Sequence, residues 1–229
     1  MKLCELLGIR PGVTAVIGGG GKTTLLRTLG EELAAEGKRV LLCATTKIYP
    51  FPDLPNLTDP TETELAKALA AHRPACAGTP VPGTGKLTAP AIPMARLAEL
   101  ADYVLAEADG AAGRPLKAHA AHEPVVPPEA NQIIWMVGAS GFGRPVREAV
   151  HRPEEFWFAT DLEMDGPVTP EAVAELLQTE GSTAWPPIRV FVNQAEDEAA
   201  LAAARRLAER LPWPVCAGAL KRRKWTCLS

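Results

Sequence analysis

One short stretch of the chain has the residue types needed to hold phosphate groups. It consists of four consecutive glycines and three polar residues, namely Gly18, Gly19, Gly20, Gly21, Lys22, Thr23 and Thr24. Glycine lets backbone N–H groups approach an anion, because no Cβ atom stands in the way. A lysine can bridge terminal phosphates, and a threonine hydroxyl can ligate Mg²⁺. The stretch therefore predicts binding of ATP or GTP together with magnesium.

The spacing of this stretch departs from the standard phosphate-binding pattern G-x-x-x-x-G-K-[ST]. That pattern needs a glycine at position 16, where this chain has Val16. The shorter form present here is similar to the loop of Mur-type ligases and their folate relatives. The alternative is a glycine-rich turn whose lysine is only solvated. Because a predicted strand precedes the stretch and a predicted helix follows it, we expect phosphate binding.

Two acids follow another apolar segment. Glu107 and Asp109 lie two residues apart at the end of "YVLAEADG", so both side chains are expected on the same face of a strand. Ligands of parallel α/β sheets bind beyond the carboxyl ends of the strands. A carboxylate there could hold Mg²⁺ or orient an attacking group. The alternatives are a helix cap or a surface acid.

A proline-framed polar loop comes next and contains Arg114, Lys117, His119, His122 and Glu123. Its cations could bind a second anionic group, and His122 beside Glu123 could carry a proton. The two histidines also have a metal-like spacing, but no third ligand is evident. For each of these residues a solvated loop is the alternative.

The elements that would position these residues alternate along the chain. Apolar segments predict strands at 13–18, 39–46, 103–110, 131–138, 188–193 and around Val215, whereas helical periodicity marks 22–36, 61–71, 94–101 and 195–211, with a helix-rich stretch before 180. Thr61 and Glu64 form a capping-box pattern. This alternation predicts an α/β protein whose mostly parallel sheet has helices on both faces, as in a P-loop NTPase-like three-layer sandwich. We expect a single domain over 1–229, with a minor subdivision near 141–150 as the alternative.

Composition excludes several classes of protein. The chain of 229 residues is 47% hydrophobic and 22% charged, and its formal net charge of -3 argues against a general nucleic-acid binder. No apolar run approaches the roughly 20 residues of a membrane span. Glu5 and Arg10 interrupt any signal-peptide core, and the five cysteines form no C-x-x-C pair. We therefore expect a cytoplasmic protein with no membrane or nucleic-acid partner.

Two further segments carry simpler expectations. The 22 prolines gather in 50–60, 79–93, 115–128 and 184–187, which predicts long, semi-rigid connections. The basic run 221–224, "KRRK", reads as a solvated tail, or else as a docking site for an acidic partner or an anionic substrate.

Several blocks in a fixed order resemble the YqeC-like family. They are "GGGGKTT", "TTKI", "EADGA", "RPLK" and "HEPVVP", and the similarity continues through "VHRPEEF" to "VNQAED", so it covers most of the chain. The resemblance implies a P-loop NTPase-like protein of selenium cofactor biosynthesis, an accessory to selenium-dependent molybdenum hydroxylases. A client hydroxylase is then an expected partner. The link to selenium rests on this resemblance alone.

The resemblance also draws attention to Thr45, Thr46 and Lys47, which become candidates for contacts to the γ-phosphate or Mg²⁺. Without it, this TTK segment after a strand would read as a turn. Asn193 opens "NQAE", which is similar to the guanine-reading N-K-x-D element, with Gln194 in place of lysine. Asn193 could contact guanine or adenine, or cap the following helix. The glycine loop favours ATP, and GTP stays open.

Together these features predict a magnesium-dependent enzyme that transfers or hydrolyses a nucleotide phosphate. Lys22 and the glycine loop would hold the phosphates, and Thr23, Asp109 and Glu107 the metal. Arg114, Lys117 and His122 would face a small, anionic second substrate. A nucleotide-gated chaperone or insertase that loads a cofactor onto a client hydroxylase is the alternative, and a purely regulatory nucleotide sensor is a third interpretation.

Overall fold

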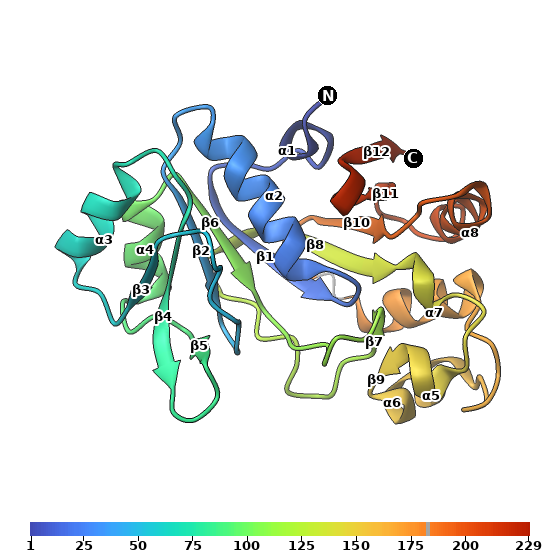
Figure 1. Ribbon diagram of the computed structural model, residues 1–229. Helices are drawn as coiled ribbons and strands as arrows, with labels where there is room; N and C mark the ends of the chain where they lie inside the picture. Colours follow the sequence, from blue (N-terminus) through green and yellow to red (C-terminus); the bar gives the residue numbers. More distant parts are fainter. Residues whose placement is uncertain (182–183) are drawn as a thin grey trace. The chain divides into compact units, whose positions relative to one another are not determined.

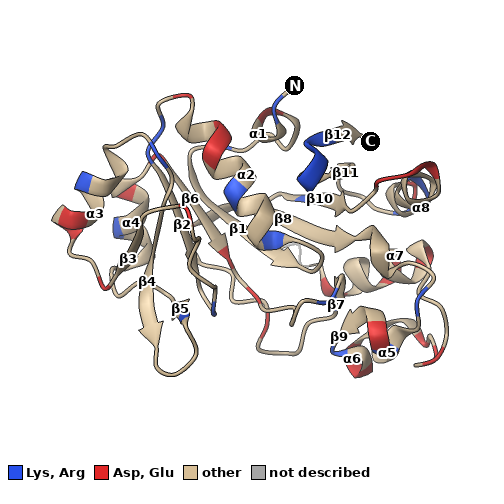
Figure 2. Cartoon of the chain, viewed as in Figure 1, with Lys and Arg blue, Asp and Glu red and all other residues tan. Residues whose placement is uncertain are grey.

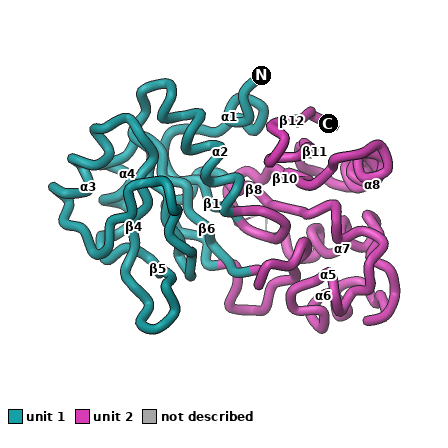
Figure 3. The backbone as a smooth tube through the Cα atoms, in the orientation of Figure 1, with its two compact units in different colours: residues 1–16, 23–110, 125–132 teal, residues 17–22, 111–124, 133–229 magenta. Residues whose placement is uncertain are grey.

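The computed structural model describes residues 1–181 and 184–229. The chain forms two compact units, each assembled from separate stretches of sequence (Figure 3). The first unit comprises Met1–Val16, Thr23–Gly110 and Val125–Gln132, and the second comprises Ile17–Lys22, Ala111–Pro124 and Ile133–Ser229. Residues 141–150 lie wholly inside the second unit. The single domain that the sequence suggests stays a prediction.

The first unit contains a parallel sheet. Its strands follow the order β1 (Gly12–Gly18, of which 12–16 lie in this unit), β6 (Tyr103–Glu107), β2 (Val40–Ala44), β4 (Ala75–Val81) and β3 (Asn56–Thr58). The short strand β5 (Lys86–Thr88) pairs antiparallel with β4. In the register, Glu107 of β6 is opposite Val16 of β1 and Ala44 of β2. Strands β2 and β6 therefore end together, opposite Val16 of β1.

Helices cover both faces of this sheet (Figure 1). The helices of the unit are α1 (Leu3–Leu6), α2 (Lys22–Ala34, in this unit from Thr23), α3 (Glu62–Leu69) and α4 (Met94–Leu100). Leu65 of α3 and Leu97 of α4 belong to one buried cluster with Leu41 of β2. The next residue of β2, Leu42, points to the opposite face, where a Cβ on Gly30 of α2 would lie 3.2 Å from its Cδ2. The alternation along β2 thus separates a layer of α3 and α4 from a layer of α2.

The second unit has its own mostly parallel strands. Their order is β8 (Ala130–Gly138, of which 133–138 lie in this unit), β10 (Ile188–Asn193), β11 (Val215–Ala219) and β12 (Lys224–Cys227), with only β12 antiparallel to its neighbour. A separate pair joins β7 (Leu116–Lys117) to β9 (Val150–His151). The helical segments are η1 (Ala139–Gly141), α5 (Val146–Ala149), α6 (Pro153–Thr160), α7 (Pro170–Glu180), α8 (Glu198–Ala208) and η2 (Leu220–Arg222).

The predicted fold class is confirmed: the chain is an α/β protein with mostly parallel strands flanked by helices. Two segments differ from expectation. Strand β4 begins before the proline-rich stretch 79–93 and, with β5, occupies part of it. The sequence did not predict β4, because its buried small residues, such as Ala75 and Ala77, form no long apolar run. The basic run 221–224 is not a free tail, since it forms η2 and the start of β12 (Figure 2). Lysine and arginine are common on such edge strands, where charge discourages further pairing.

In the two described ranges, 1–181 and 184–229, no helix combines the length and the apolar character that crossing a membrane requires.

The start of α3 offers a direct test of the local sequence signals. The predicted capping box is confirmed: the Thr61 hydroxyl accepts from the Glu64 amide at 3.3 Å, and the Glu64 carboxylate accepts from the Thr61 amide at 2.8 Å. We expect Thr61→Ala to lower the free energy of unfolding by about 1 kcal/mol. Urea denaturation followed by circular dichroism measures this. The matched control is Thr63→Ala, an exposed threonine inside the same helix, and an equal loss in both variants would contradict the prediction.

Candidate functional site

The glycine loop, residues 17–22 of the second unit, packs tightly against neighbouring backbone. A Cβ on Gly18 would lie 2.3 Å from the carbonyl oxygen of Met136, and a Cβ on Gly20 would lie 2.4 Å from the Cα of Gly138. Both glycines also have positive φ, +89° and +84°. Larger residues therefore do not fit at these positions, whatever the loop binds.

Two amides of the loop are already used within the protein. The Gly19 N–H donates to the Met136 carbonyl at 3.0 Å, and the Gly20 N–H donates to the Arg114 carbonyl at 3.2 Å. The first amides of a helix, by contrast, have no carbonyl partner inside that helix and carry the positive end of its dipole. Helix α2 begins at Lys22. The place suited to an anion is therefore the first turn of α2, rather than the whole glycine run.

Lys22 and Asn193 both bind the backbone of this loop. The Lys22 side chain is 5% exposed, and its Nζ donates to the Gly18 carbonyl at 2.6 Å. The Asn193 amide donates to the Gly20 carbonyl at 2.7 Å, and its oxygen accepts from the Leu220 amide at 3.1 Å. Asn193 thus connects the loop to the end of β11. It does not cap the following helix, because Asp197 is the N-cap of α8, so that expectation is wrong. A contact between Asn193 and a base stays a prediction.

In the first unit, Glu107 at the end of β6 adjoins the start of α2. The Thr23 hydroxyl donates to the Glu107 carboxylate at 3.1 Å, and Glu107 is 8% exposed. Asp109, two residues later, is fully buried in the same unit. Thr23 directly follows Lys22 in the chain. A hydroxyl and a carboxylate are therefore held together at the helix terminus that the sequence marks for phosphate binding.

The segment after β2 lies at the same edge of the sheet. The Thr45 amide donates to the Glu107 carbonyl at 3.0 Å, and the Thr45 hydroxyl donates to the Val125 carbonyl at 2.7 Å. The hydroxyl oxygen of Thr46 is buried and has no hydrogen-bond partner among the residues that the structure describes. Lys47 is exposed. Thr45 thus adjoins Glu107, as the carboxyl ends of neighbouring parallel strands should, and Thr46 and Lys47 follow it in the chain.

The polar loop of the second unit carries a buried ion-pair network. Lys117, whose side chain is 0% exposed, pairs with the Glu123 carboxylate at 3.0 Å, and the Arg152 guanidinium binds its other oxygen at 2.7 Å. Burial alone would raise the pKa of Glu123, but the hydrogen bonds from Arg152 and Lys117 outweigh it and lower that pKa to about 2. Burial, together with the charges of Lys117 and Arg152, also lowers the pKa of His151.

The other members of this loop are dispersed. The Arg114 guanidinium donates to the Arg147 carbonyl. His119 is buried beside Trp135, and its Nδ1 contacts the Glu180 carboxylate at 2.6 Å, whereas His122 is exposed. In the described ranges, no group of three or more His, Cys, Asp or Glu side chains is arranged to hold a metal ion.

Sequence reasoning missed Arg152 and Glu180, although both neutralise or bind residues of the polar loop. Arg152 lies 29 positions from Glu123, and Glu180 lies 61 positions from His119. No local pattern predicts such pairs. Only the clustering of buried, unlike charges in the fold identifies them.

The Glu123 network predicts a specific dependence of stability on pH. A carboxylate whose pKa is lowered in the folded protein stabilises it above its usual pKa, and this contribution is lost as the pH falls toward the folded value. We expect Glu123→Gln to lower the free energy of unfolding by about 2–4 kcal/mol at pH 7, since it leaves Lys117 buried without its carboxylate. The difference from the wild type should shrink between the usual pKa near 4.5 and about 2.

Urea denaturation at pH 7, 5 and 3 measures this difference. Glu129→Gln, an exposed acid five residues after the cis Glu123–Pro124 bond, is the control and should have little effect at any pH. A Glu123→Gln difference that stays constant over this range would contradict the assignment.

Comparison with known proteins places these features in a family. The family model described as "YqeC protein" matches residues 14–154, a span that includes the glycine loop, Glu107 and the Lys117–Glu123 pair. The "Uncharacterized protein YqeC" of Escherichia coli is 36% identical over 174 residues, which cover 73% of this chain but only 65% of the Escherichia coli protein, just under two thirds of its length. No solved structure matches the chain. With more than half of its length matched by the family model, the chain belongs to the YqeC family.

Proposed function

We propose that this protein binds the phosphates of ATP or GTP, with Mg²⁺, at the first turn of α2 and catalyses transfer or hydrolysis of a phosphate. The observation that carries the proposal is the 3.1 Å hydrogen bond from the Thr23 hydroxyl to the Glu107 carboxylate, directly after the buried Lys22. A helix N-terminus, a lysine and a hydroxyl–carboxylate pair are the groups that magnesium–nucleotide sites combine.

The oxygen atoms present fit a magnesium ion. Mg²⁺ prefers oxygen ligands and is usually held by one or two carboxylates together with water and substrate phosphates. Thr23 and Glu107 supply a hydroxyl and a carboxylate, and the buried Asp109 follows on the same segment. The buried Thr46 hydroxyl follows the adjacent strand β2 and has no hydrogen-bond partner within residues 1–181 and 184–229, which supports a ligand on this side of the first unit. When bound, magnesium would neutralise charge on the phosphates.

The protein's own contribution would be positioning and charge stabilisation. The amides from Gly21 to Thr24 would donate to phosphate oxygens. The Lys22 ammonium would exchange its bond to the Gly18 carbonyl for a terminal phosphate, which is an anion and hence a stronger acceptor. The Thr23 hydroxyl and the Glu107 carboxylate would hold the metal.

We further propose that a small anionic molecule is the second substrate and that the reaction serves the maturation of selenium-dependent molybdenum hydroxylases in the cytoplasm. Membership of the YqeC family supports this context at the level of the family. Arg114 and the exposed His122 are the residues proposed to meet this substrate. Lys117 is bound to Glu123, so its proposed role is to fix the position of the Glu123 carboxylate in the polar loop.

Removal of the lysine tests the phosphate site. We expect Lys22→Ala to weaken binding of Mg–ATP and Mg–GTP at least about tenfold, because a charge-assisted hydrogen bond to phosphate is lost. Isothermal titration calorimetry measures the affinity, and circular dichroism checks that the variant is folded. The exposed Lys38→Ala variant is the control. Unchanged nucleotide affinity in folded Lys22→Ala would show that the assignment is wrong.

Removal of the hydroxyl tests the metal site separately. We expect Thr23→Val to abolish the increase in nucleotide affinity on adding Mg²⁺, while the affinity in EDTA stays as in the wild type. Thr23→Ser retains the hydroxyl and should restore the magnesium effect. The readout is the ratio of the dissociation constants with and without Mg²⁺. A normal ratio in Thr23→Val would exclude Thr23 as a ligand.

A further inference from the structure

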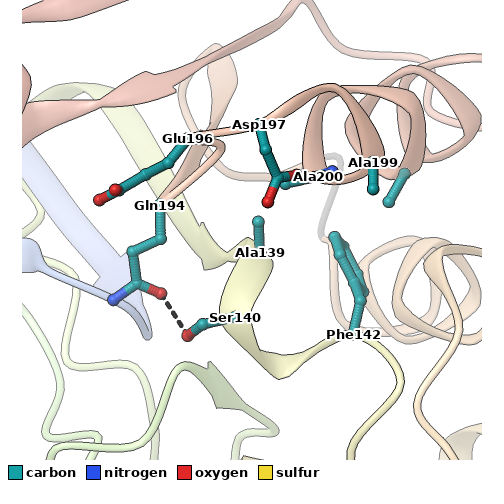
Figure 4. Close-up of a pocket in the computed structure, with 9 residues that line it drawn as sticks. Ala139, Ser140, Phe142, Gln194, Glu196, Asp197, Ala199 and Ala200 are labelled. Atoms are coloured by element: carbon teal, nitrogen blue, oxygen red, sulfur yellow. Dashed lines mark hydrogen bonds between the residues drawn. The ribbon is translucent and has the colours of Figure 1, made fainter.

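An open pocket of about 540 Å³ lies within the second unit, between η1 and the start of α8 (Figure 4). Its volume is within the range of about 300–1,000 Å³ that is usual for small-ligand sites. The pocket combines apolar and polar walls. Its lining residues include Ala139, Ser140, Phe142, Gln194, Asp197 and Ala200.

Two residues that contact the glycine loop are each followed directly in the chain by a residue that lines the pocket. Asn193, which donates to the Gly20 carbonyl at 2.7 Å, is followed directly by the lining residue Gln194. Gly138, whose Cα approaches the Cβ position of Gly20 to 2.4 Å, is followed directly by the lining residue Ala139. The ends of β8 and β10 therefore contact the loop and then continue as walls of the pocket. Within the second unit, the glycine loop and the pocket are thus connected through the ends of the same two strands.

The apolar part of the pocket suits a flat ring. Figure 4 shows the Phe142 side chain opposite the first turn of α8, where Ala199 and Ala200 present only methyl groups. A planar heteroaromatic ring can stack on a phenyl group and still fit beneath alanines. Larger residues on α8 would fill this space.

The polar part of the pocket offers a carboxylate and an amide. Figure 4 shows the Asp197 carboxylate pointing from the start of α8 toward Ala139. Its Oδ1 accepts from the Ala200 amide at 2.8 Å. Gln194 accepts from the Ser140 hydroxyl at 2.6 Å through Oε1, which orients its amide nitrogen as a donor. The charge of the other lining acid, Glu196, is balanced by Arg222 at 2.6 Å.

We propose that this pocket binds the base of the nucleotide and selects guanine over adenine, an inference that rests on the proposed nucleotide function. Guanine carries the N1–H and N2–H donors side by side, next to the O6 acceptor. The Asp197 carboxylate can accept from the donors, and the Gln194 amide can donate to O6. Adenine presents the N1 acceptor in the same place, where a carboxylate repels it. The choice between bases is thus made by charge and hydrogen bonding.

Calorimetric titration with GDP, ADP and inorganic tripolyphosphate, all with Mg²⁺, tests the inference. We expect GDP to bind at least about tenfold more tightly than ADP, because adenine offers the Asp197 carboxylate no donors at the positions of guanine N1–H and N2–H. Asp197→Asn should remove this preference, because an amide cannot accept from both donors as a carboxylate does. Asparagine caps helices as well as aspartate, so α8 should remain intact. Glu209→Gln, at the other end of α8, is the control.

The outcomes separate the two proposals. Tripolyphosphate binding by Asp197→Asn should stay within about twofold of the wild type, because tripolyphosphate has no base that could contact Asp197. Equal affinities for GDP and ADP, or a preference that survives Asp197→Asn, would overturn the guanine pocket and leave the phosphate site standing. A guanine preference without tripolyphosphate binding would overturn the phosphate site alone. Absence of binding by all three ligands would overturn both.

Discussion

The close approach of the glycine loop to the backbone around it is the constraint on which the second unit depends. The loop lies against Met136 to Gly138 and against Arg114, with no room for a Cβ on Gly18 or Gly20. This packing uses the Gly19 and Gly20 amides. The proposed anion site is therefore the first turn of α2, because the first amides of a helix have no carbonyl partner within that helix. The same contacts join the loop to the strand ends that line the neighbouring pocket.

Polar groups in this protein serve two different purposes. The Glu123 carboxylate pairs with both Lys117 and Arg152, so the buried Lys117 charge has an opposite charge beside it inside the fold. The Thr23 hydroxyl and the Glu107 carboxylate, by contrast, form the hydrogen-bonded pair that we propose exchanges its mutual bond for a metal ion. The first group of charges maintains the polar loop, whereas the second pair supplies the oxygen atoms of the proposed ligand site.

Much of the fold could be predicted from local sequence patterns. The apolar runs that become β1, β2 and β6 and the helical periodicity of α2 are properties of neighbouring residues, as is the Thr61–Glu64 capping box. Strand β4 could not be predicted in this way, because its small residues form a strand only when α3 and α4 cover them. Strand β12 was missed for a similar reason: its hydrogen bonds come from pairing with β11, and its residues are largely exposed.

For the candidate site, the sequence by itself determined which residue types adjoin one another in the chain: glycines before Lys22 and Thr23, and acids at the end of β6. Only the tertiary structure decided their partners. It placed Thr23 against Glu107, 84 positions away, and Asn193 against Gly20, 173 positions away. The physical reason is that helix, strand and turn preferences act between near neighbours, whereas these bonds form only after distant strand ends have been aligned in a sheet.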